Sequence, residues 1–457
     1  MDNNNIDRRA FLKAGTAVGL GAIAVAAATT GCTYELSHPG QANMIDFKAK
    51  PIARVRMGFI GVGGQGSSHV SNFLKIENVE IRAICDIVES KVAQTQKRVE
   101  ETGGRKPDGY SQGELDFKRM CRRDDLDLIF ISTPWRWHVP MCVEAMNTGK
   151  HAAVEVPAAV TIDECWQLVK TSEKTHRHCV MMENCCYDRI ELMILNIVRQ
   201  GILGELICAE CGYLHDLRAV KFNQYGEGLW RRAHSIKRNG DLYPTHGLGP
   251  IAQCMNINRG NQFDYLVSMA TKTRGLTIYS EKTFGIDSPQ AKEKYALGDV
   301  VTSMIRTVKG ETIIVQHDTN SPRPYSRDIL VQGTKGIVRK YPKARVHIEG
   351  VSKPHHWDDI DDYLQQYDHP LWKSMEEISK GAGHGGMDYI EDYRLINALR
   401  KGIEPDMDVY DAAAWSAVCE LSERSVAGNS KPVKFPDFTR GMWKRHRALQ
   451  VNSCMDV

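Results

Sequence analysis

The sequence predicts an α/β fold built from two domains, and three observations predict it. An apolar strand runs into a Gly-x-Gly-x-x-Gly turn made by Gly61, Gly63 and Gly66, and a helix follows the turn. Apolar strands and amphipathic helices then alternate as far as residue 185. Beyond that point, strand-like runs follow one another without helices long enough for parallel crossovers. We therefore expect an N-terminal doubly wound parallel Rossmann sheet and a C-terminal α+β domain with a largely antiparallel open sheet.

The glycine turn predicts a phosphate cradle. Gly61 permits a tight turn, Gly63 lets backbone N–H groups approach a pyrophosphate, and Gly66 allows close packing of the following helix, 67–74, on its strand. The next strand, 79–85, ends in Asp86, where the dinucleotide fingerprint places an acid for the adenosine ribose hydroxyls. Because a carboxylate there repels a 2′-phosphate, we expect the cofactor to be NAD and not NADP.

The remaining elements of the first domain follow in order. A third buried strand is expected at 126–132, with the loop Thr133–His138 at its carboxyl end. A helix over 139–148, a strand over 152–156, a helix opened by the capping box Thr161-x-x-Glu164 and a last strand over 180–183 complete the alternation. Ligands of such a sheet bind beyond the carboxyl ends of its strands. The domain is predicted to span residues 51–185.

The second domain is predicted to span residues 186–457. A helix over 190–199 leads into five strand-like runs, at 205–213, 265–270, 300–308, 312–317 and 328–338. Two further helices are expected at 388–401 and 409–427.

The first 32 residues predict a twin-arginine signal segment. Arg8 and Arg9 precede an apolar run, 14–28, that is too short for a membrane span. A polar linker, 33–50, follows. These features predict export to the periplasm in a folded state. The sequence leaves open whether Cys32 receives a lipid anchor, which is the only membrane contact expected, and whether the chain forms a homo-oligomer.

Composition and residue spacing argue against three kinds of function or site: nucleic-acid binding, a disulfide framework and a metal site. The net charge of +3 comes from nearly balanced ions and gives no reason to expect nucleic-acid binding. The 13 cysteines are scattered through apparent strands and helices, so we expect no disulfide framework. Cys208 and Cys211, the one Cys-x-x-Cys, lack a second ligand pair, and His355 and His356 lack helical spacing. No metal site is predicted.

This order of domains resembles the Gfo/Idh/MocA oxidoreductases, which usually have Glu-Lys-Pro at the end of the fifth strand. Here the corresponding residues are Glu155, Val156 and Pro157, so the usual catalytic ammonium group is missing. A closer resemblance, to the NAD-dependent α-N-acetylgalactosaminidases of glycoside hydrolase family 109, covers nearly the whole chain after the leader. The matching segments include TPWRWH (133–138), ENCCYDR (183–189), GYLHDLR (212–218), NGDLYPTHGLGP (239–250) and GAGHGGMDY (381–389).

The resemblance implies a set of site residues. Beside the three motif glycines, those implied to touch NAD are Gly64, Gln65, Asp86, Trp135, Arg136, Trp137, His138, Glu155, Val156 and Asn184. Those implied to hold the sugar are Tyr213, Arg231, Tyr243, Pro244, Thr245, His246 and Tyr325. Tyr187 and His246 are implied to transfer protons.

The implied reaction is hydrolysis of terminal α-N-acetylgalactosamine by a redox detour. Oxidation of the sugar at C3 acidifies the C2 hydrogen, β-elimination expels the anomeric oxygen, water adds to C1, and the hydride returns. Histidine suits this proton transfer near neutral pH, and Tyr187 or Tyr243 could stabilise an enolate oxygen. Which of His246, Tyr187 and Tyr243 moves which proton stays open. The alternative functions are a net NAD-dependent sugar dehydrogenase and an inactive sugar-binding protein on the same scaffold.

Overall fold

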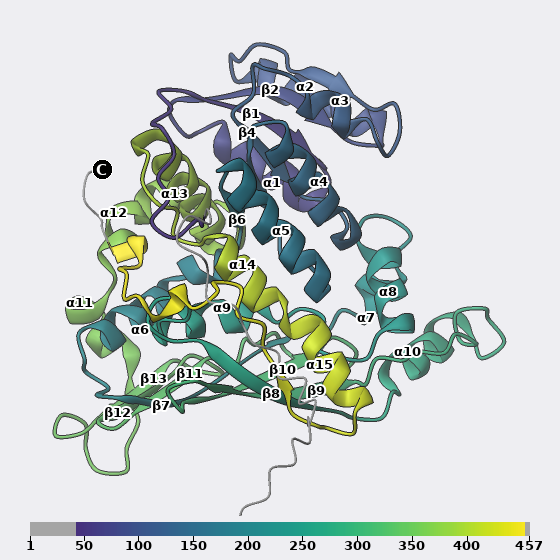
Figure 1. The fold of residues 1–457 in the computed structure, drawn as a ribbon. Helices are drawn as coiled ribbons and strands as arrows, with labels where there is room; N and C mark the ends of the chain where they lie inside the picture. The colour runs from purple at the N-terminus through teal and green to yellow at the C-terminus, as the bar shows by residue number, and fades with distance from the viewer. Residues whose placement is uncertain (1–42, 453–457) are drawn as a thin grey trace, which may run out of the picture. The chain divides into compact units, whose positions relative to one another are not determined.

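The computed structural model describes residues 43–452 (Figure 1). The predicted signal segment, Cys32 and the first part of the linker lie outside these residues. The described end of the linker is packed on the protein: Met44 and Ile45 are buried, and the Met44 N–H donates to the Tyr410 hydroxyl at 3.0 Å. None of the helices in the described range is both long enough and apolar enough to cross a membrane.

The N-terminal sheet has six parallel strands in the order β3-β2-β1-β4-β5-β6. The strands are β1 (Val55–Ile60), β2 (Val79–Cys85), β3 (Asp108–Tyr110), β4 (Leu128–Ile131), β5 (His151–Val154) and β6 (Cys179–Met181). The helices between them are α1 (Gly64–Phe73), α2 (Glu89–Glu101), α3 (Phe117–Cys121), α4 (His138–Asn147) and α5 (Ile162–Thr175). This confirms the doubly wound sheet. The short edge strand β3 was not predicted, because three residues that include a glycine give no periodic signal.

Local chemistry explains where these elements begin. The Thr161 hydroxyl accepts from the Glu164 N–H, and the Glu164 carboxylate accepts from the Thr161 N–H, which confirms the predicted capping box at the start of α5. The central strands β1, β4 and β5 are almost wholly buried, as expected for a parallel sheet covered on both faces. The order of strands reverses between β1 and β4, so a ligand crevice is expected outside their carboxyl ends.

The C-terminal sheet has nine strands in the order β14-β13-β12-β11-β7-β10-β9-β8-β15. Their bounds are β7 (Leu206–Leu214), β8 (Phe263–Ala270), β9 (Val300–Thr307), β10 (Thr312–Asp318), β11 (Leu330–Gly333), β12 (Gly336–Arg339), β13 (Arg345–Ile348), β14 (Asp358–Asp359) and β15 (Val433–Lys434). Only the central pair β7 and β10 is parallel, so the prediction of a largely antiparallel sheet is confirmed. The single strand predicted at 328–338 was wrong: it is a hairpin of β11 and β12, turned at Thr334 and Lys335.

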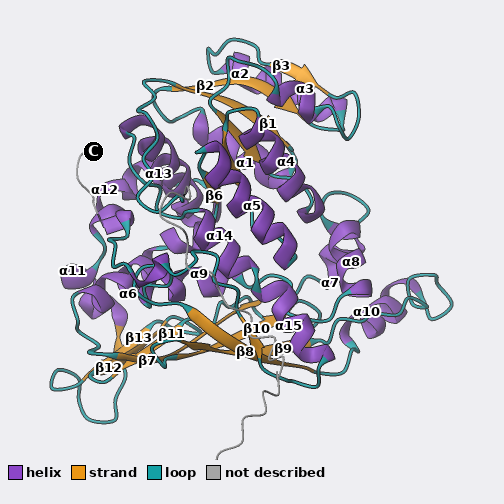
Figure 2. Cartoon of the chain, in the orientation of Figure 1, coloured by secondary structure: helices purple, strands orange, loops and turns teal. Residues whose placement is uncertain are grey.

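Helices gather on one face of this sheet, between it and the Rossmann half (Figure 2). The longer ones are α6 (Arg189–Arg199), α8 (Gly228–Lys237), α9 (Thr245–Cys254), α10 (Gly275–Phe284), α12 (Pro370–Ser379), α13 (Met387–Lys401), α14 (Val409–Ser416) and α15 (Val418–Ala427). Shorter helices of this half are α7 (Arg218–Phe222), α11 (Leu364–Tyr367), and the 3-10 turns at Asn184–Tyr187, Ile360–Tyr363, Gly383–Gly386, Met442–Lys444 and Gln450–Asn452; a further 3-10 turn, Trp135–Trp137, follows β4 in the Rossmann half. The predicted helix over 409–427 is interrupted at Ala417 and forms two helices.

The C-terminal helices return to the Rossmann half. Helix α13 packs beside α1, and α14 packs beside α5. Residues near position 390 therefore come within reach of the glycine turn near position 63, although more than 300 residues separate them along the chain.

Candidate active site

A cavity of about 630 Å³ lies beyond the carboxyl ends of the Rossmann strands and is lined by residues of both halves. It contains most of the predicted site residues: Gly61, Gly63, Gly64, Gln65, Asp86, Trp135, Arg136, Trp137, His138, Glu155, Val156, Asn184, Tyr213, Arg231, Tyr243 and His246. A single cavity therefore joins the predicted cofactor and sugar residues.

The glycine turn is shaped to hold a phosphate group. Gly61 has φ +86°, and a Cβ there would lie 2.2 Å from the Ser132 carbonyl oxygen. A Cβ on Gly66 would lie 2.1 Å from the Gly61 carbonyl oxygen, which is why Gly66 packs in the turn and does not line the cavity. A Cβ on Gly64 would meet no described atom within 4 Å, and no side chain caps the start of α1. No side chain therefore occupies the first N–H groups of α1, and they can donate to a bound pyrophosphate.

Asp86 lies at the end of β2 and braces the same turn. Its Oδ2 accepts from the Val62 N–H and its Oδ1 from the Val88 N–H, both at 2.9 Å. Each carboxylate oxygen has a second lone pair, and the residue lines the cavity. Both the open helix start and this acid fit NAD.

The loop from Trp135 to His138 connects the two ends of the cavity. Trp135 is 5% exposed, and its ring stacks on Tyr243 with 5.6 Å between centroids. Both ring nitrogens of His138 lie 2.8 Å from backbone carbonyl oxygens, those of Pro157 and Thr133. His138 therefore holds the loop in place. Trp135 packs against the end of the cavity that contains the predicted sugar residues, which is called the sugar end below.

Glu155 belongs to a row of hydrogen-bonded side chains, with His69 and Asp392, that was not predicted from the sequence. His69 of α1 lies between two carboxylates, with Nε2 2.8 Å from Glu155 Oε1 and Nδ1 2.8 Å from Asp392 Oδ1. Burial alone would lower the pKa of His69, but the two carboxylates outweigh it and raise that pKa well above its ordinary value. Because Val156 supplies no ammonium group, His69 is the cation beside Glu155. A histidine four residues after Gln65 was the available signal, but Asp392 could not be connected to it from sequence.

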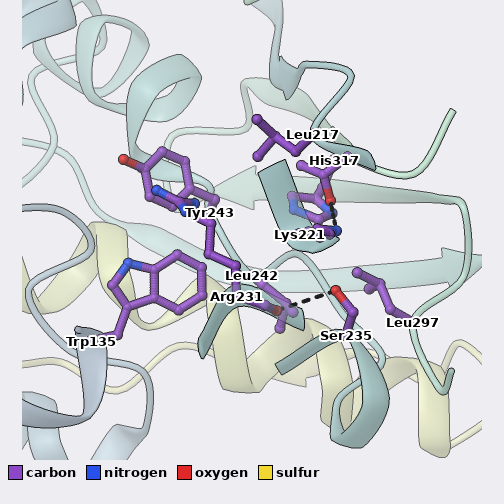
Figure 3. A pocket seen from close by; sticks show the side chains of 10 residues that line it. Trp135, Leu217, Lys221, Arg231, Ser235, Leu242, Tyr243, Leu297 and His317 are labelled. Carbon is purple, nitrogen blue, oxygen red and sulfur yellow. Dashed lines mark hydrogen bonds between the residues drawn. The ribbon is translucent and has the colours of Figure 1, made fainter. Parts of the chain in front are cut away.

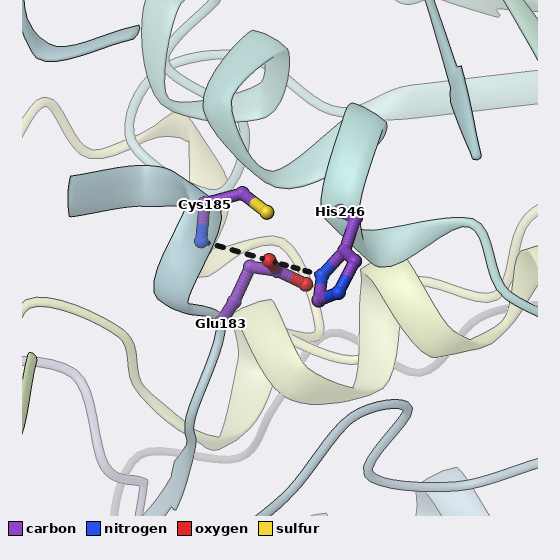
Figure 4. A group of neighbouring side chains, drawn as sticks. All are labelled: Glu183, Cys185 and His246. Atoms are coloured by element: carbon purple, nitrogen blue, oxygen red, sulfur yellow. Dashed lines mark hydrogen bonds and ion pairs between the residues drawn. The ribbon is translucent and has the colours of Figure 1, made fainter. Parts of the chain in front are cut away.

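At the sugar end, His246 is held by a buried acid. Its Nδ1 lies 2.7 Å from Glu183 Oε1, and Glu183 is fully buried (Figure 4). Burial would raise the pKa of Glu183, but its electrostatic interaction and hydrogen bond with His246 keep it below its ordinary value. Since the carboxylate must accept, Nδ1 of His246 is the donor, and in the neutral imidazole Nε2 then offers a lone pair. His246 lines the cavity, and a neutral imidazole held in this way can accept a proton at Nε2.

Aromatic rings and one cation surround His246. The rings of Tyr243 and Tyr213 lie 4.9 Å and 5.4 Å from the imidazole. The Arg231 guanidinium lies over the rings of Trp135, Trp230 and Tyr243 at 4.9–5.2 Å. Burial raises the pKa of Tyr213 to about 12 and that of Tyr243 well above its ordinary value, so both hydroxyls stay protonated donors.

A second, very small cavity of about 10 Å³ lies behind these rings and shares Trp135, Arg231 and Tyr243 with the large one (Figure 3). It has room for about one water molecule. Lys221 donates from Nζ to Thr319 Oγ1 and Asn320 Oδ1, both at 2.7 Å, and burial lowers its pKa to about 7. Buried, hydrogen-bonded polar side chains therefore underlie the sugar end.

Cys185 lies beside the Glu183 and His246 pair, and the three ligand-type atoms come within 4.8 Å of one another. Burial raises the pKa of the Cys185 thiol well above its ordinary value, whereas a metal ligand would be a thiolate. The short contact between Glu183 and His246 already explains this group as a hydrogen-bonded pair.

The structure corrects the prediction for Tyr187. Its side chain is 3% exposed and does not line the cavity, and its hydroxyl donates to Asp406 Oδ2 at 3.0 Å. The turn after β6 directs the ring into the core, so Tyr187 is not placed to exchange protons with a ligand.

Three predicted sugar residues also lie outside the cavity lining. Pro244 and Thr245 begin helix α9, which places His246 in its first turn. Tyr325 accepts a hydrogen bond from Arg327 at 3.1 Å, and its ring lies 5.0 Å from that of His215. Pro244 and Thr245 therefore position a functional residue, and Tyr325 lies behind His215.

His215, Trp230 and His384 line the cavity and were not predicted. His215 Nδ1 lies 2.9 Å from the Tyr213 hydroxyl, and burial lowers its pKa. Tyr213 and His215 alternate on β7, and Trp230 neighbours Arg231, so both could have been suspected from their segments. His384 lies in the matching segment GAGHGGMDY (381–389), which was the available signal for it.

Comparison with known proteins decides the family. Residues 187–445 match the description "Glycosyl hydrolase 109, C-terminal domain", and residues 55–183 match "Oxidoreductase family, NAD-binding Rossmann fold". The chain belongs to glycosyl hydrolase family 109. As a family 109 enzyme it has an NAD-binding Rossmann domain, and the predicted resemblance is confirmed.

Curated relatives of family 109 match nearly the whole chain. A "Glycosyl hydrolase family 109 protein" of Solibacter usitatus is 47% identical, covering 97% of this chain and 99% of the relative. The "Alpha-N-acetylgalactosaminidase" of Shewanella oneidensis is 46% identical, covering 98% of this chain and 99% of the relative.

Solved structures show the same fold at low identity. Levoglucosan dehydrogenase in complex with NADH has a TM-score of 0.66 at 17% identity, covering 84% of this chain and 99% of the other. An inositol dehydrogenase homologue of Azotobacter vinelandii, complexed with NAD+, has a TM-score of 0.63 at 17% identity, covering 85% and 99%. These similarities concern the architecture of this family 109 enzyme.

Proposed function

We propose that this enzyme hydrolyses terminal α-N-acetylgalactosamine from glycans by transient oxidation of the sugar. The family assignment and the 46% identity to a protein named alpha-N-acetylgalactosaminidase support the substrate class. The observation that supports the route most directly is the His246 and Glu183 pair, which shares one cavity with the glycine cradle.

When bound, NAD would accept a hydride from C3 of the sugar and return it after the glycosidic bond has broken. The C3 ketone makes the C2 hydrogen acidic, and His246 Nε2 takes that proton while Glu183 stabilises the resulting imidazolium through Nδ1. The C1–O bond breaks as the C1–C2 double bond forms. Water then adds to C1 and C2 regains a proton. The proton lost from the C3 hydroxyl on oxidation is restored when the hydride returns, and one proton of the added water balances the proton that the leaving oxygen takes up, so there is no net oxidation.

Tyr213 and Tyr243 are suited to stabilise the oxygen on which negative charge develops. Burial keeps both hydroxyls protonated, and both rings contact the imidazole of His246. Arg231, stacked on three aromatic rings and 11% exposed, adds a fixed positive charge beside them. With Val156 in place of a lysine, we assign the base to His246, the histidine at this end of the cavity that a buried carboxylate orients.

We also propose that the enzyme works in the periplasm after twin-arginine export, on the basis of Arg8, Arg9 and the apolar run that follows. Changing both arginines to lysine should retain active enzyme in the cytoplasm. Periplasmic activity equal to that of the unchanged protein would contradict this. A lipid on Cys32 and homo-oligomer formation stay predictions, testable by mass spectrometry of the mature protein and by light scattering.

The test of function uses the holoenzyme and an aryl α-N-acetylgalactosaminide without added hydride acceptor. We expect many turnovers of phenol release and no accumulation of NADH absorbance at ~340 nm. A net dehydrogenase would accumulate NADH, and a binding protein would release no phenol. The aryl α-galactoside, which has a hydroxyl in place of the 2-acetamido group, is the matched substrate control.

The route is tested by isotopes. Hydrolysis in D₂O should leave deuterium at C2 of the released sugar, because elimination breaks the C2–H bond. Substrate deuterated at C3 should react more slowly where hydride transfer limits the rate. If C2 keeps its hydrogen and C3 deuteration has no effect, direct displacement becomes the better account.

A further inference from the structure

A buried lysine behind the sugar end has no carboxylate partner. Lys221 of α7 is 3% exposed, and its Nζ donates to two uncharged oxygens, Thr319 Oγ1 and Asn320 Oδ1, each at 2.7 Å. An ammonium group has three N–H donors, and no described residue accepts from the third. The charges of Asp318 and Asp299 favour the protonated form, but neither carboxylate is hydrogen-bonded to it. The positive charge of Lys221 is therefore not compensated by a direct partner among the described residues.

The small cavity of about 10 Å³ lies beside Lys221 and brings further hydrogen-bond donors together (Figure 3). His317 of β10 lines it and is 2% exposed, and its Nδ1 has no described hydrogen-bond partner. Burial lowers the pKa of His317 to about 3, so its ring is neutral and has one N–H to donate. Arg231 adds a second positive charge, whereas its partner Glu227 does not line this cavity. None of the described residues that line the cavity has a carboxylate.

The size and the walls of the cavity restrict the ligand. The space is about that of one water molecule, which excludes polyatomic anions such as phosphate or a carboxylate. Much of the remaining wall is apolar and comes from Leu217, Leu242 and Leu297. A water molecule accepts hydrogen bonds but has no charge with which to compensate Lys221 and Arg231. A single monatomic anion meets both requirements.

We propose that this cavity is a chloride site, in which one chloride ion accepts hydrogen bonds from Lys221 Nζ and from the ring of His317. The ion compensates the positive charge that Lys221 and Arg231 place behind the sugar end. Because Arg231 and Tyr243 line both cavities, chloride also stabilises the wall that the two cavities share. Its binding does not depend on which reaction takes place in the large cavity.

The first test locates the ion. Crystals of the holoenzyme are grown with sodium bromide in place of sodium chloride, because the anomalous scattering of bromide distinguishes the ion from water. We expect an anomalous peak within hydrogen-bond distance of Lys221 Nζ, beside His317. A structure with bromide only elsewhere, or with water at this position, would overturn the proposal.

The second test measures thermal unfolding of the holoenzyme in sodium chloride and in sodium gluconate at equal ionic strength. At pH 6, ~100 mM chloride should raise the Tm by ~2 °C relative to gluconate. Burial lowers the pKa of Lys221 to about 7; Arg231 also lowers it, while Asp318 and Asp299 raise it. Since Lys221 is protonated below that pH, the difference between the two salts should be smaller at pH 8.5.

Lys221→Met removes the charge at similar length and should unfold at the same temperature in both salts. Lys150→Met is the matched control, because Lys150 is also buried with a lowered pKa and donates to a backbone carbonyl, but lines neither cavity. It should keep the response to chloride. Equal Tm values of the unchanged protein in the two salts would contradict the proposal, and so would a full chloride response in Lys221→Met. The bromide crystals decide the question if Lys221→Met does not fold.

Discussion

The two ends of the active-site cavity are built in different ways. The cofactor end is supplied mainly by one stretch, Val55–Asp86, in which strand, glycine turn, helix and acid follow in order. The sugar end takes Tyr213 from β7, Arg231 from α8 and His246 from α9, and Glu183 comes from the end of β6. The first binds phosphate through backbone N–H groups, which a short sequence can position. The second needs side chains that meet only after the chain has folded.

This difference predicts that substitutions at the sugar end lower the rate of catalysis. Substitutions at the cofactor end are expected to destabilise the fold or to weaken NAD binding. The largest effect is expected for His246→Ala, which should lower the rate of hydrolysis by about 10²–10⁴ because the general base is lost. NAD should remain bound, since His246 contacts Glu183 and not the cradle. Loss of NAD together with activity would show that the two ends are not separable.

Gly61→Ala should unfold the cofactor end. Its Cβ would meet the Ser132 carbonyl at 2.2 Å in a backbone with φ +86°, which should lower the free energy of unfolding by about 3 kcal/mol. Gly64→Ala is the matched control: nothing lies within 4 Å of the added methyl, and denaturant unfolding of its apoprotein should change by less than about 1 kcal/mol. Equal stability of the two variants would contradict the assigned role of Gly61.

Each half also contains a buried histidine, His151 in β5 and His317 in β10, and burial lowers the pKa of each from 6.5 to about 3. The unfolded chain binds these protons below pH 6.5, whereas the folded protein does not until about pH 3. Stability is therefore fully present above about pH 6.5 and falls as the pH decreases toward about 3, by about 1.4 kcal/mol per pH unit for each histidine. His151→Gln and His317→Gln should each reduce this slope in urea unfolding; an unchanged slope would contradict it.

Asp86→Ala should weaken NAD binding about tenfold, because the ribose loses its acceptor and the Val62 and Val88 N–H groups lose theirs. Asp86→Asn keeps one acceptor oxygen and should lose less. Calorimetry on the apoproteins separates these cases. If Asp86→Ala binds NAD as tightly as the unchanged protein, the assignment of Asp86 to the cofactor site is contradicted.

The smallest effect is expected for Tyr187→Phe. Because its hydroxyl faces Asp406, which Arg394 also binds at 2.7 Å, turnover should stay within about twofold and stability should fall by about 1 kcal/mol. Tyr243→Phe, at the cavity, should lower turnover about tenfold. A severe loss of turnover in Tyr187→Phe with normal folding would support a catalytic role for Tyr187.

Sequence patterns predicted the strands more reliably than the contacts. The bounds of β2 are as expected, because the composition of this short strand and the polar Asp86 that follows it are local properties. The strand predicted over 328–338 is a hairpin, because Thr334 and Lys335, between Gly333 and Gly336, form a turn that the prediction did not recognise. The resemblance implied that Tyr187 is a site residue, but the turn after β6 directs its ring into the core.

The sequence by itself determined the Rossmann half, the glycine cradle, the acid at Asp86 and the family, because these depend on residues close together in the chain. Only the tertiary structure decided the partners of the functional groups: Glu183 with His246, and His69 between Glu155 and Asp392. A buried charge is stable only beside a partner that compensates its desolvation. Which residue serves as that partner depends on how α13 and α9 pack, and this is not a local property of the sequence.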